Sequence, residues 1–507
     1  MNRTLLPRVI ASSLLLFTLY PDWGYAQSDQ PESRLRVKEV AAHMNFLAAD
    51  ELKGRRTGSE GIMIAAKYLQ AQYASFGLEF APGMDSWCQD VPYVEVTPPE
   101  SGSLSYGEGF FEHGKDMLFL SSPELDLSKQ KYVFVGYGTK TDEQNDYEGL
   151  DVNGKVVITY LGLPGEEDPG GVIGSVSDKR KWAKEEGAIG LIELYRLRFP
   201  WGFAKRYFGS PRISLDESAE DDNPDFFYGW IQDNQGKIGA YFLENNEGKM
   251  NLTCSGSDKR TFSSPNVIGY LEGSDPELKE EVIVVSAHYD HVGVGEQGGG
   301  RYTKEDSIFN GARDNAFGTV AVLSAAKSFA QNPPARSVLF IALSGEEIGL
   351  LGSRYYAAHP VYPLNKTIFN VNTDGAGYAV TNAVSVIGYG RTSMDDQIDA
   401  GAQAFNMDVI ANPAPEQGLF DRSDNVNFAA KGVPAINVAP GLQSFNREIS
   451  KYYHQVTDNP ETVDMDYLLV YCQTVTHIAR LIANIPERPV WMEGDKYEPA
   501  AKALYGE

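Results

Sequence analysis

The second half of the chain consists of short, almost uninterrupted apolar segments that alternate with helix-like segments, and this alternation restricts the possible folds strongly. From about residue 265 onward the segments are EEVIVVSAH, NAFGTVAVLSAAKSFAQ, RSVLFIALS, KTIFNVNTD, AVSVIGYG and GVPAINVAP. Strands that are apolar along their whole length belong to sheets that helices cover on both faces. We therefore predict an α/β domain here, with ligands bound beyond the carboxyl ends of its strands.

The same kinds of side chain follow these predicted strands. They are His288 and Asp290 after EEVIVVSAH, Asp314 before the next helix, Glu346 and Glu347 after RSVLFIALS, Asp374 at the end of KTIFNVNTD, and His454 after the last strand. A single Asp after a strand is usually a helix cap. Imidazole and carboxylate ligands together favour borderline divalent metals, zinc foremost, so their joint placement predicts a metal site.

The residues before about 265 show a different pattern of apolar and polar residues. Residues 34–79 indicate a helix, a loop with the sequence GRRTGS, and a second helix that ends near Gly77. Between about 85 and 265, KYVFVGYG, GKVVITYLG and AIGLIELY are typical of strands, and KRKWAKEEG of a helix closed by Gly187. This middle region lacks clustered His and carboxylate residues, which favours a binding or covering role over a catalytic one.

Length and charge limit the classes of function. A chain of 507 residues has room for two or three domains. Its formal net charge of −25 opposes polyanionic partners, so nucleic acid is not expected as a ligand.

The first residues have the order of a secretory signal. Arg3 and Arg8 precede an apolar stretch over 9–20, and small residues surround Ala26. We expect cleavage after Ala26 and an exported protein, periplasmic or extracellular, without stable membrane insertion after cleavage. Three cysteines are too few for a disulfide framework; Cys88 and Cys254 pair in one interpretation and are free buried thiols in the other.

Five motifs resemble those of a known family. AHYDHVG, RDNAFGT, SGEEIGLLGS, NTDGAG and YYHQVTDNPETVD are similar to the successive motifs of the M28 zinc aminopeptidases, which include bacterial leucyl aminopeptidases and glutamate carboxypeptidase-like proteins. The resemblance implies the zinc-exopeptidase (phosphorylase/hydrolase-like) fold, a three-layer α/β domain with a mixed central sheet, at 27–109 and 263–507. The segment 110–262 resembles the β-rich protease-associated (PA) domain that is inserted in many members.

The resemblance also implies roles for individual residues. His288 and Asp374 would hold one zinc ion, Glu347 and His454 a second, and Asp314 would bridge the two. Glu346 would act as general base, a role that adjacency alone would equally allow for Glu347. Asp290 would hold the imidazole ligand in its tautomer, and Tyr453 would donate to the oxyanion or, equally, pack as a structural aromatic. His291 is expected to support the site rather than to bind metal.

Three positions depart from the family pattern. Arg313 stands where an acidic or small residue is frequent, and Phe317 where Ser is usual. Both are expected to narrow the pocket or to change its charge without removing a metal ligand. Asn425 stands where many members have His, so Ser423 and Asp424 receive little support as site residues.

The resulting hypothesis is an exported aminopeptidase with two zinc ions that acts on peptides. A carboxypeptidase or dipeptidase of the same fold is the alternative; it would need a cation for the substrate carboxylate, for which Arg313, Arg391 and Arg422 are candidates. A single-zinc glutaminyl cyclase is disfavoured by the complete ligand set, as is a non-enzymatic binding protein on this scaffold. No GxSxG, HExxH or Walker motif is present. The sequence leaves the oligomeric state open.

Overall fold

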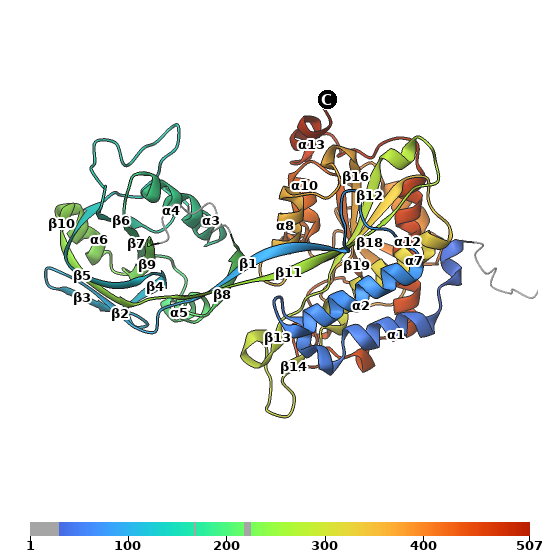
Figure 1. Cartoon of the computed structure of the whole chain (residues 1–507), viewed down its shortest axis with the longest axis horizontal. Helices are drawn as coiled ribbons and strands as arrows, with labels where there is room; N and C mark the ends of the chain where they lie inside the picture. The colour runs from blue at the N-terminus through green and yellow to red at the C-terminus, as the bar shows by residue number, and fades with distance from the viewer. Residues whose placement is uncertain (1–29, 167–168, 217–224, 507) are drawn as a thin grey trace, which may run out of the picture.

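The computed structural model describes residues 30–166, 169–216 and 225–506. The predicted signal peptide, residues 1–26, lies outside these residues. The described chain forms two units, each built on its own β-sheet, and a pair of long strands joins them (Figure 1).

The larger unit contains a nine-stranded mixed sheet. In order across the sheet, its strands are β18 (Asp408–Ala411), β17 (Ala383–Ile387), β19 (Ala435–Pro440), β16 (Thr367–Asn372), β12 (Val282–His288), β15 (Ser337–Leu343), β11 (Asp258–Leu271), β1 (Cys88–Thr97) and β8 (Arg212–Leu215). The centre is parallel, because β12 pairs in parallel with β15 and β16, and β16 with β19. Antiparallel pairing begins at β11 on one side and at β17 on the other.

Helices cover both faces of this sheet (Figure 1). One face carries α1 (Val37–Leu47), α2 (Glu60–Phe76), α7 (Phe317–Gln331), α9 (Asp395–Gln403) and α12 (Met465–Asn484), and the other α8 (Leu351–Ala358), α10 (Asn425–Ala430) and α13 (Glu498–Tyr505). Successive residues of β12 point to opposite faces of the sheet: Ile283 and Val285 pack under the first group of helices, and Val282 and Val284 pack under the second. This alternation explains why the strand is apolar throughout, and the predicted three-layer α/β fold is confirmed.

The smaller unit has an eight-stranded mixed sheet with an apolar core on each face. Its strands, in order, are β3 (Gly109–Glu112), β2 (Gly102–Tyr106), β10 (Glu247–Ser255), β5 (Glu124–Phe134), β6 (Val156–Tyr160), β7 (Gly190–Tyr195), β9 (Phe227–Gln232) and β4 (Met117–Ser121). Its helices are α3 (Pro169–Gly174), α4 (Val176–Glu185), α5 (Trp201–Phe208) and α6 (Lys237–Glu244). The strands and the helix predicted in this region are confirmed as β5, β6, β7 and α4.

A buried ion pair lies inside the smaller unit. The side chains of Lys179 and Glu193 are in contact and fully buried. Lys179 also donates to the carbonyl oxygens of Tyr160, at 2.5 Å, and Gly162, at 3.1 Å, and the hydroxyl of Tyr228 donates to Glu193. All partners of this charge pair therefore come from the smaller unit.

The two units share a long antiparallel ribbon. β1 and β11 pair from Cys88 with Val267 to Thr97 with Asp258 and run between the units (Figure 1). The predicted boundary after residue 109 falls at the start of β3, and the one after 262 falls inside β11. Because β11 belongs to the larger sheet and reaches the smaller unit, the division of the chain into 27–109, 110–262 and 263–507 stays a prediction.

The start of the described chain is anchored on α12. Glu32 is fully buried; its carboxylate lies 2.5 Å from Nε of Arg480 and 3.0 Å from Nδ1 of His477. Burial acts to raise the pKa of Glu32, but the hydrogen bond from His477 and the charge of Arg480 outweigh it and lower the pKa.

The three cysteines are unpaired. Cys88 accepts a hydrogen bond from Gln70, whereas Cys254 and Cys472 are buried. The structure therefore agrees with the interpretation of free thiols. Among residues 30–166, 169–216 and 225–506, no helix is both long and apolar enough to cross a membrane.

Candidate metal centre

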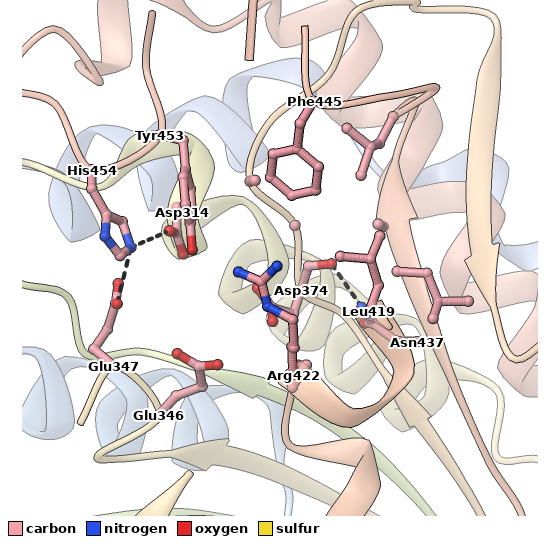
Figure 2. Close-up of a pocket in the computed structure, with 16 residues that line it drawn as sticks. Asp314, Glu346, Glu347, Asp374, Leu419, Arg422, Asn437, Phe445, Tyr453 and His454 are labelled. Atoms are coloured by element: carbon pink, nitrogen blue, oxygen red, sulfur yellow. Dashed lines mark hydrogen bonds and ion pairs between the residues drawn. The ribbon is translucent and has the colours of Figure 1, made fainter. Parts of the chain in front are cut away.

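Three neighbouring strands bring their carboxyl ends to one edge of the larger sheet. His288 is the last residue of β12, Glu346 and Glu347 follow β15, and Asp374 follows β16. Because these strands are parallel, their ends open on the same side. Figure 2 shows the carboxylates of Glu346, Glu347 and Asp374 around one pocket.

Asp314 comes from a different part of the fold, the segment just before α7. Asp458 fixes this segment by accepting hydrogen bonds from the backbone N–H groups of Arg313, at 3.0 Å, and of Asp314, at 3.2 Å. The two carboxylate oxygens of Asp314 face different imidazoles. Its Oδ1 lies 3.4 Å from Nε2 of His288, and its Oδ2 lies 3.2 Å from Nε2 of His454.

The remaining potential ligands form two groups around Asp314. In the first, Nε2 of His288 lies 3.1 Å from Oδ1 of Asp374 and 3.9 Å from Oε2 of Glu346. In the second, Nε2 of His454 lies 3.0 Å from Oε2 of Glu347 (Figure 2). The five residues predicted as metal ligands are thus brought together, and Asp314 stands between the two groups.

A third imidazole lies beside the second group. His291 is fully buried, its Nδ1 lies 2.6 Å from Oε1 of Glu347, and its Nε2 has no hydrogen-bond partner among the residues that the structure describes. His291, Asp314 and Glu347 are close enough to hold an ion together. The imidazole of His454 contacts both carboxylates, whereas that of His291 contacts the carboxylate of Glu347.

The spacing of these donor atoms fits zinc. Ligand atoms at ~2.0–2.1 Å from a tetrahedral zinc ion lie about 3.3 Å from one another. The nitrogen–oxygen separations of the imidazoles of His288 and His454 from Asp314, Asp374 and Glu347 are 3.0–3.4 Å. Donor chemistry and spacing therefore both suit two adjacent ions with Asp314 between them.

Asp290 supports the site in a way that differs in detail from the prediction. The nearer acceptor for Nδ1 of His288 is the backbone carbonyl of Asp290, at 3.2 Å, whereas the carboxylate lies at 3.7 Å. The carboxylate instead accepts hydrogen bonds from the hydroxyl of Thr57, at 2.8 Å, and from the backbone N–H of Glu346, at 3.2 Å. Thr57 also accepts from the N–H of Gly345 and so joins the N-terminal loop to the β15 turn.

Arg55, in the same loop as Thr57, is a buried cation behind the site, 1% exposed. Its guanidinium donates to the backbone carbonyls of Leu47, Tyr289, Asn310 and Gly311. Burial lowers the pKa of Arg55 to about 10, although the carboxylates of Asp290 and Asp458 act to raise it, so it is charged at neutral pH. Both residues lie in the predicted GRRTGS loop, and their role could not be predicted from it because their partners are distant along the chain.

The two adjacent glutamates differ in proton affinity. Burial raises the pKa of Glu346 well above its ordinary value, and the charge of Asp374 adds to this effect despite the opposing charge of His288. Burial also acts to raise the pKa of Glu347, but His291 and His454 outweigh it and lower the pKa to about 2. Contacts with two imidazoles therefore hold Glu347 in its charged form, whereas the nearest imidazole nitrogen to Glu346, Nε2 of His288, lies 3.9 Å away.

Tyr453 lines the same pocket and stacks on His454, with ring centroids 4.1 Å apart. Figure 2 shows its hydroxyl end beside the carboxylate of Asp314. Burial raises the pKa of Tyr453, so the hydroxyl keeps its proton at neutral pH and can donate it in a hydrogen bond.

Two of the departures from the family pattern lie away from the pocket, which corrects the expectation that they narrow or recharge it. The guanidinium of Arg313 stacks on Tyr378 and Tyr452 and donates to the carbonyl oxygen of Thr462. Phe317 packs in the main core against α12. Neither side chain lines the pocket.

The pocket has an acidic side and an apolar side. Its acidic side is formed by the four carboxylates already described, and Ser423, Asn437 and Arg422 add polar atoms. The apolar wall consists of Ile387, Leu419, Ala439, Leu442 and Phe445. A substrate can therefore place charged atoms at the metal ligands and an apolar group against the wall.

Residues 266–479 match the model of peptidase family M28. This segment contains all five predicted ligands and Glu346. The chain therefore carries a peptidase family M28 domain, and the fold and family place that domain among the metallopeptidases.

Known proteins similar to this chain agree with that class. The structure aligns with an aminopeptidase from Aneurinibacillus sp. strain AM-1 over 88% of this chain and 94% of that one, with a TM-score of 0.54 and 20% identity. The vacuolar membrane protease of Saccharomyces cerevisiae strain YJM789 is 34% identical over 161 residues, 32% of this chain. That of Lachancea thermotolerans is 28% identical over 186 residues, 37% of this chain. The match spans 14% of the Saccharomyces protein and 17% of the Lachancea protein, so most of their length has no counterpart in the alignment.

Proposed function

We propose that the protein is an exopeptidase with two zinc ions that releases N-terminal residues from peptides. The observation that carries the proposal is the position of Asp314, whose two oxygens face the imidazoles of His288 and His454 at 3.4 and 3.2 Å. His288, Asp374 and Asp314 would hold one ion, and His454, Glu347 and Asp314 the other. Zinc bound at this site would lower the pKa of a water molecule toward ~7 and polarise the scissile carbonyl.

The side chains around this centre supply the proton transfers. Among the described residues the carboxylate of Glu346 makes no hydrogen bond; it lies 3.9 Å from Nε2 of His288 and lines the pocket, which leaves it free to accept a proton from water and pass it to the leaving amine. Tyr453 would donate its hydroxyl hydrogen to the oxyanion. Thr57 and Asp290 would keep the backbone before Glu346 in place.

A free amino terminus fits the acidic side of the pocket. The carboxylates of Glu346 and Asp374 both line the pocket, and the ammonium group of a peptide bound there would be paired with their negative charge. A blocked terminus would lose this pairing and would meet the same carboxylates without a positive charge. This difference favours aminopeptidase action over cleavage from the carboxyl end, for which a carboxypeptidase or dipeptidase remains the alternative hypothesis.

We also propose that the protein is exported and that residues 110–262 act as a PA domain. The support for export is the charged, apolar and small-residue order of residues 1–26. Cell fractionation of the full chain and of a version lacking 1–26 tests it: retention of the full chain in the cytoplasm would refute export.

The activity is tested with matched aminoacyl and N-acetylated peptides, each assayed with and without a chelator. We expect hydrolysis of the free peptides, at least ~10²-fold slower hydrolysis of the acetylated ones, and recovery by zinc after chelation. Faster cleavage of acetylated peptides from the carboxyl end would contradict the aminopeptidase assignment, and activity that ignores the chelator would contradict the metal site.

A further inference from the structure

The three arginines considered as partners for a substrate carboxylate have different surroundings. Arg313 is buried between two tyrosine rings and donates to a backbone carbonyl. Arg391 forms two hydrogen bonds with the carboxylate of Asp495, at 2.7 and 3.0 Å, and stacks on Phe420. Both guanidinium groups are therefore already paired and cannot bind a substrate anion without breaking these contacts.

Arg422 differs from both. It lines the pocket, it is exposed, and among the described residues its guanidinium forms no hydrogen bond or ion pair; its central carbon lies 5.9 Å from the ring centroid of Phe445. Figure 2 shows the guanidinium among the side chains that line the pocket, which include Glu346, Asp374 and Phe445. An arginine that served to neutralise the ligand carboxylates would form an ion pair with one of them, and Arg422 forms none among the described residues.

The backbone that carries Arg422 is held from both sides. The hydroxyl of Ser423 accepts from Asn372 at 2.9 Å, and Asp424 accepts from the hydroxyl of Ser353 at 2.5 Å. On the other side, the carboxylate of Asp421 binds Lys496 and is not available to Arg422. The protein thus fixes the base of this side chain and leaves its charged end free, as a binding group for a ligand requires.

The pocket around Arg422 contains Glu346 and Asp374 and would repel a substrate carboxylate that had no cation beside it. A guanidinium presents paired N–H donors that match the two oxygens of a carboxylate. We propose that Arg422 binds a carboxylate of the substrate and makes this pocket selective for peptides that carry one close to the scissile bond. This inference rests on the proposed peptidase function and names its substrate class.

The carboxylate has two possible sources, which one experiment separates. It is the side chain of an N-terminal Glu or Asp, or it is the α-carboxylate of a dipeptide. Glu-p-nitroanilide against Gln-p-nitroanilide tests the first source, and Leu-Gly against Leu-Gly-amide tests the second. Within each pair the two substrates have nearly the same shape and differ in one negative charge.

We expect the zinc-loaded protein to prefer the acidic member of one pair by about 10- to 100-fold in kcat/KM, the usual range for a charge-assisted hydrogen bond. Arg422→Gln should bring that ratio to about 1, and Arg422→Lys should restore part of it. Arg447→Gln is the matched control, because Arg447 is an exposed arginine that does not line the pocket, and its ratio should equal that of the wild type.

A ratio near 1 for both pairs in the wild type, or a ratio unchanged in Arg422→Gln, would overturn the inference. A measurement of peptide binding distinguishes a wrong role for Arg422 from a wrong assignment of the peptidase function. Calorimetry with Glu346→Gln and the peptides Glu-Ala-amide, Gln-Ala-amide, Leu-Gly and Leu-Gly-amide measures selectivity without turnover. Selective binding by a protein whose wild type hydrolyses none of these substrates would contradict the peptidase proposal and leave the role of Arg422 standing.

Discussion

The hydroxyl of Thr57 lies 2.8 Å from Oδ2 of Asp290 and links a loop near the start of the chain to the end of β12, 233 positions away. Both side chains are buried, so neither group has water as a substitute partner. Asp290 also accepts from the backbone of Glu346, and the contact therefore sets the position of the turn that carries both glutamates.

Replacing Thr57 by Val keeps the shape of the side chain and removes the hydroxyl. We expect a loss of about 1–3 kcal/mol in the free energy of unfolding, because a buried carboxylate oxygen loses its partner. Urea unfolding measures this loss, and kcat on a free peptide should fall with it. Thr57→Ser retains the hydroxyl and should stay within about 1 kcal/mol of the wild type; equal stability of the Val and Ser variants would show that the contact is unimportant.

Because Asp314 lies between the two groups of ligands, its replacement is expected to weaken the binding of both zinc ions. Zinc that binds the folded state should raise the melting temperature of the wild type as its concentration rises above the dissociation constant. Asp314→Asn removes the negative charge shared by both imidazole groups, so we expect fewer than two zinc ions per chain and a smaller thermal shift. Two tightly bound ions in this variant, measured by elemental analysis after dialysis, would argue against a bridge.

The pH dependence of stability should include a contribution from Glu32. The lowered pKa of Glu32 means that the folded protein favours its charged form relative to the unfolded chain. The resulting stabilisation is complete above about pH 4.5, the ordinary value, and is lost as the pH falls through the lowered one.

Comparison of the wild type with Glu32→Gln isolates this contribution. We expect the variant to be less stable by about 1–3 kcal/mol at pH 7 and the difference to shrink below about pH 4. Urea unfolding at a series of pH values gives the difference, and a gap that widens on acidification would contradict the assignment.

The buried ion pair of Lys179 and Glu193 is a position at which substitution is expected to destabilise the smaller unit. Lys179→Met leaves a fully buried carboxylate without its cation, and we expect a loss of about 3–5 kcal/mol. Adding Glu193→Gln removes the unpaired charge and keeps a hydrogen-bond acceptor for Tyr228, so the double variant should recover part of the loss. Denaturant unfolding of the two single variants and the double variant measures these losses; additive losses would refute the coupling.

The α/β architecture of the larger unit could be predicted from the sequence, for physical reasons. β12, β15 and β16 are buried on both faces, which produces the unbroken apolar pattern; His288 ends β12, and Asp374 lies two residues after the end of β16. The roles of Arg55 and Thr57 were not predictable, because a charged or polar residue in a glycine-rich loop has the same local pattern whether it is exposed or buried. Arg313 was misjudged for a related reason: proximity in sequence to Asp314 does not fix where a long side chain points.

Glu346 and Glu347 are expected to have different roles, base and metal ligand, and kcat measured together with zinc content for the two Gln variants distinguishes these roles. Glu346→Gln should keep both zinc ions and lose at least ~10³-fold in kcat, because it removes the base and no ligand. Glu347→Gln should lose zinc, and excess zinc should restore part of its activity. A Glu346→Gln protein that binds less zinc than Glu347→Gln, or that retains kcat, would contradict the account.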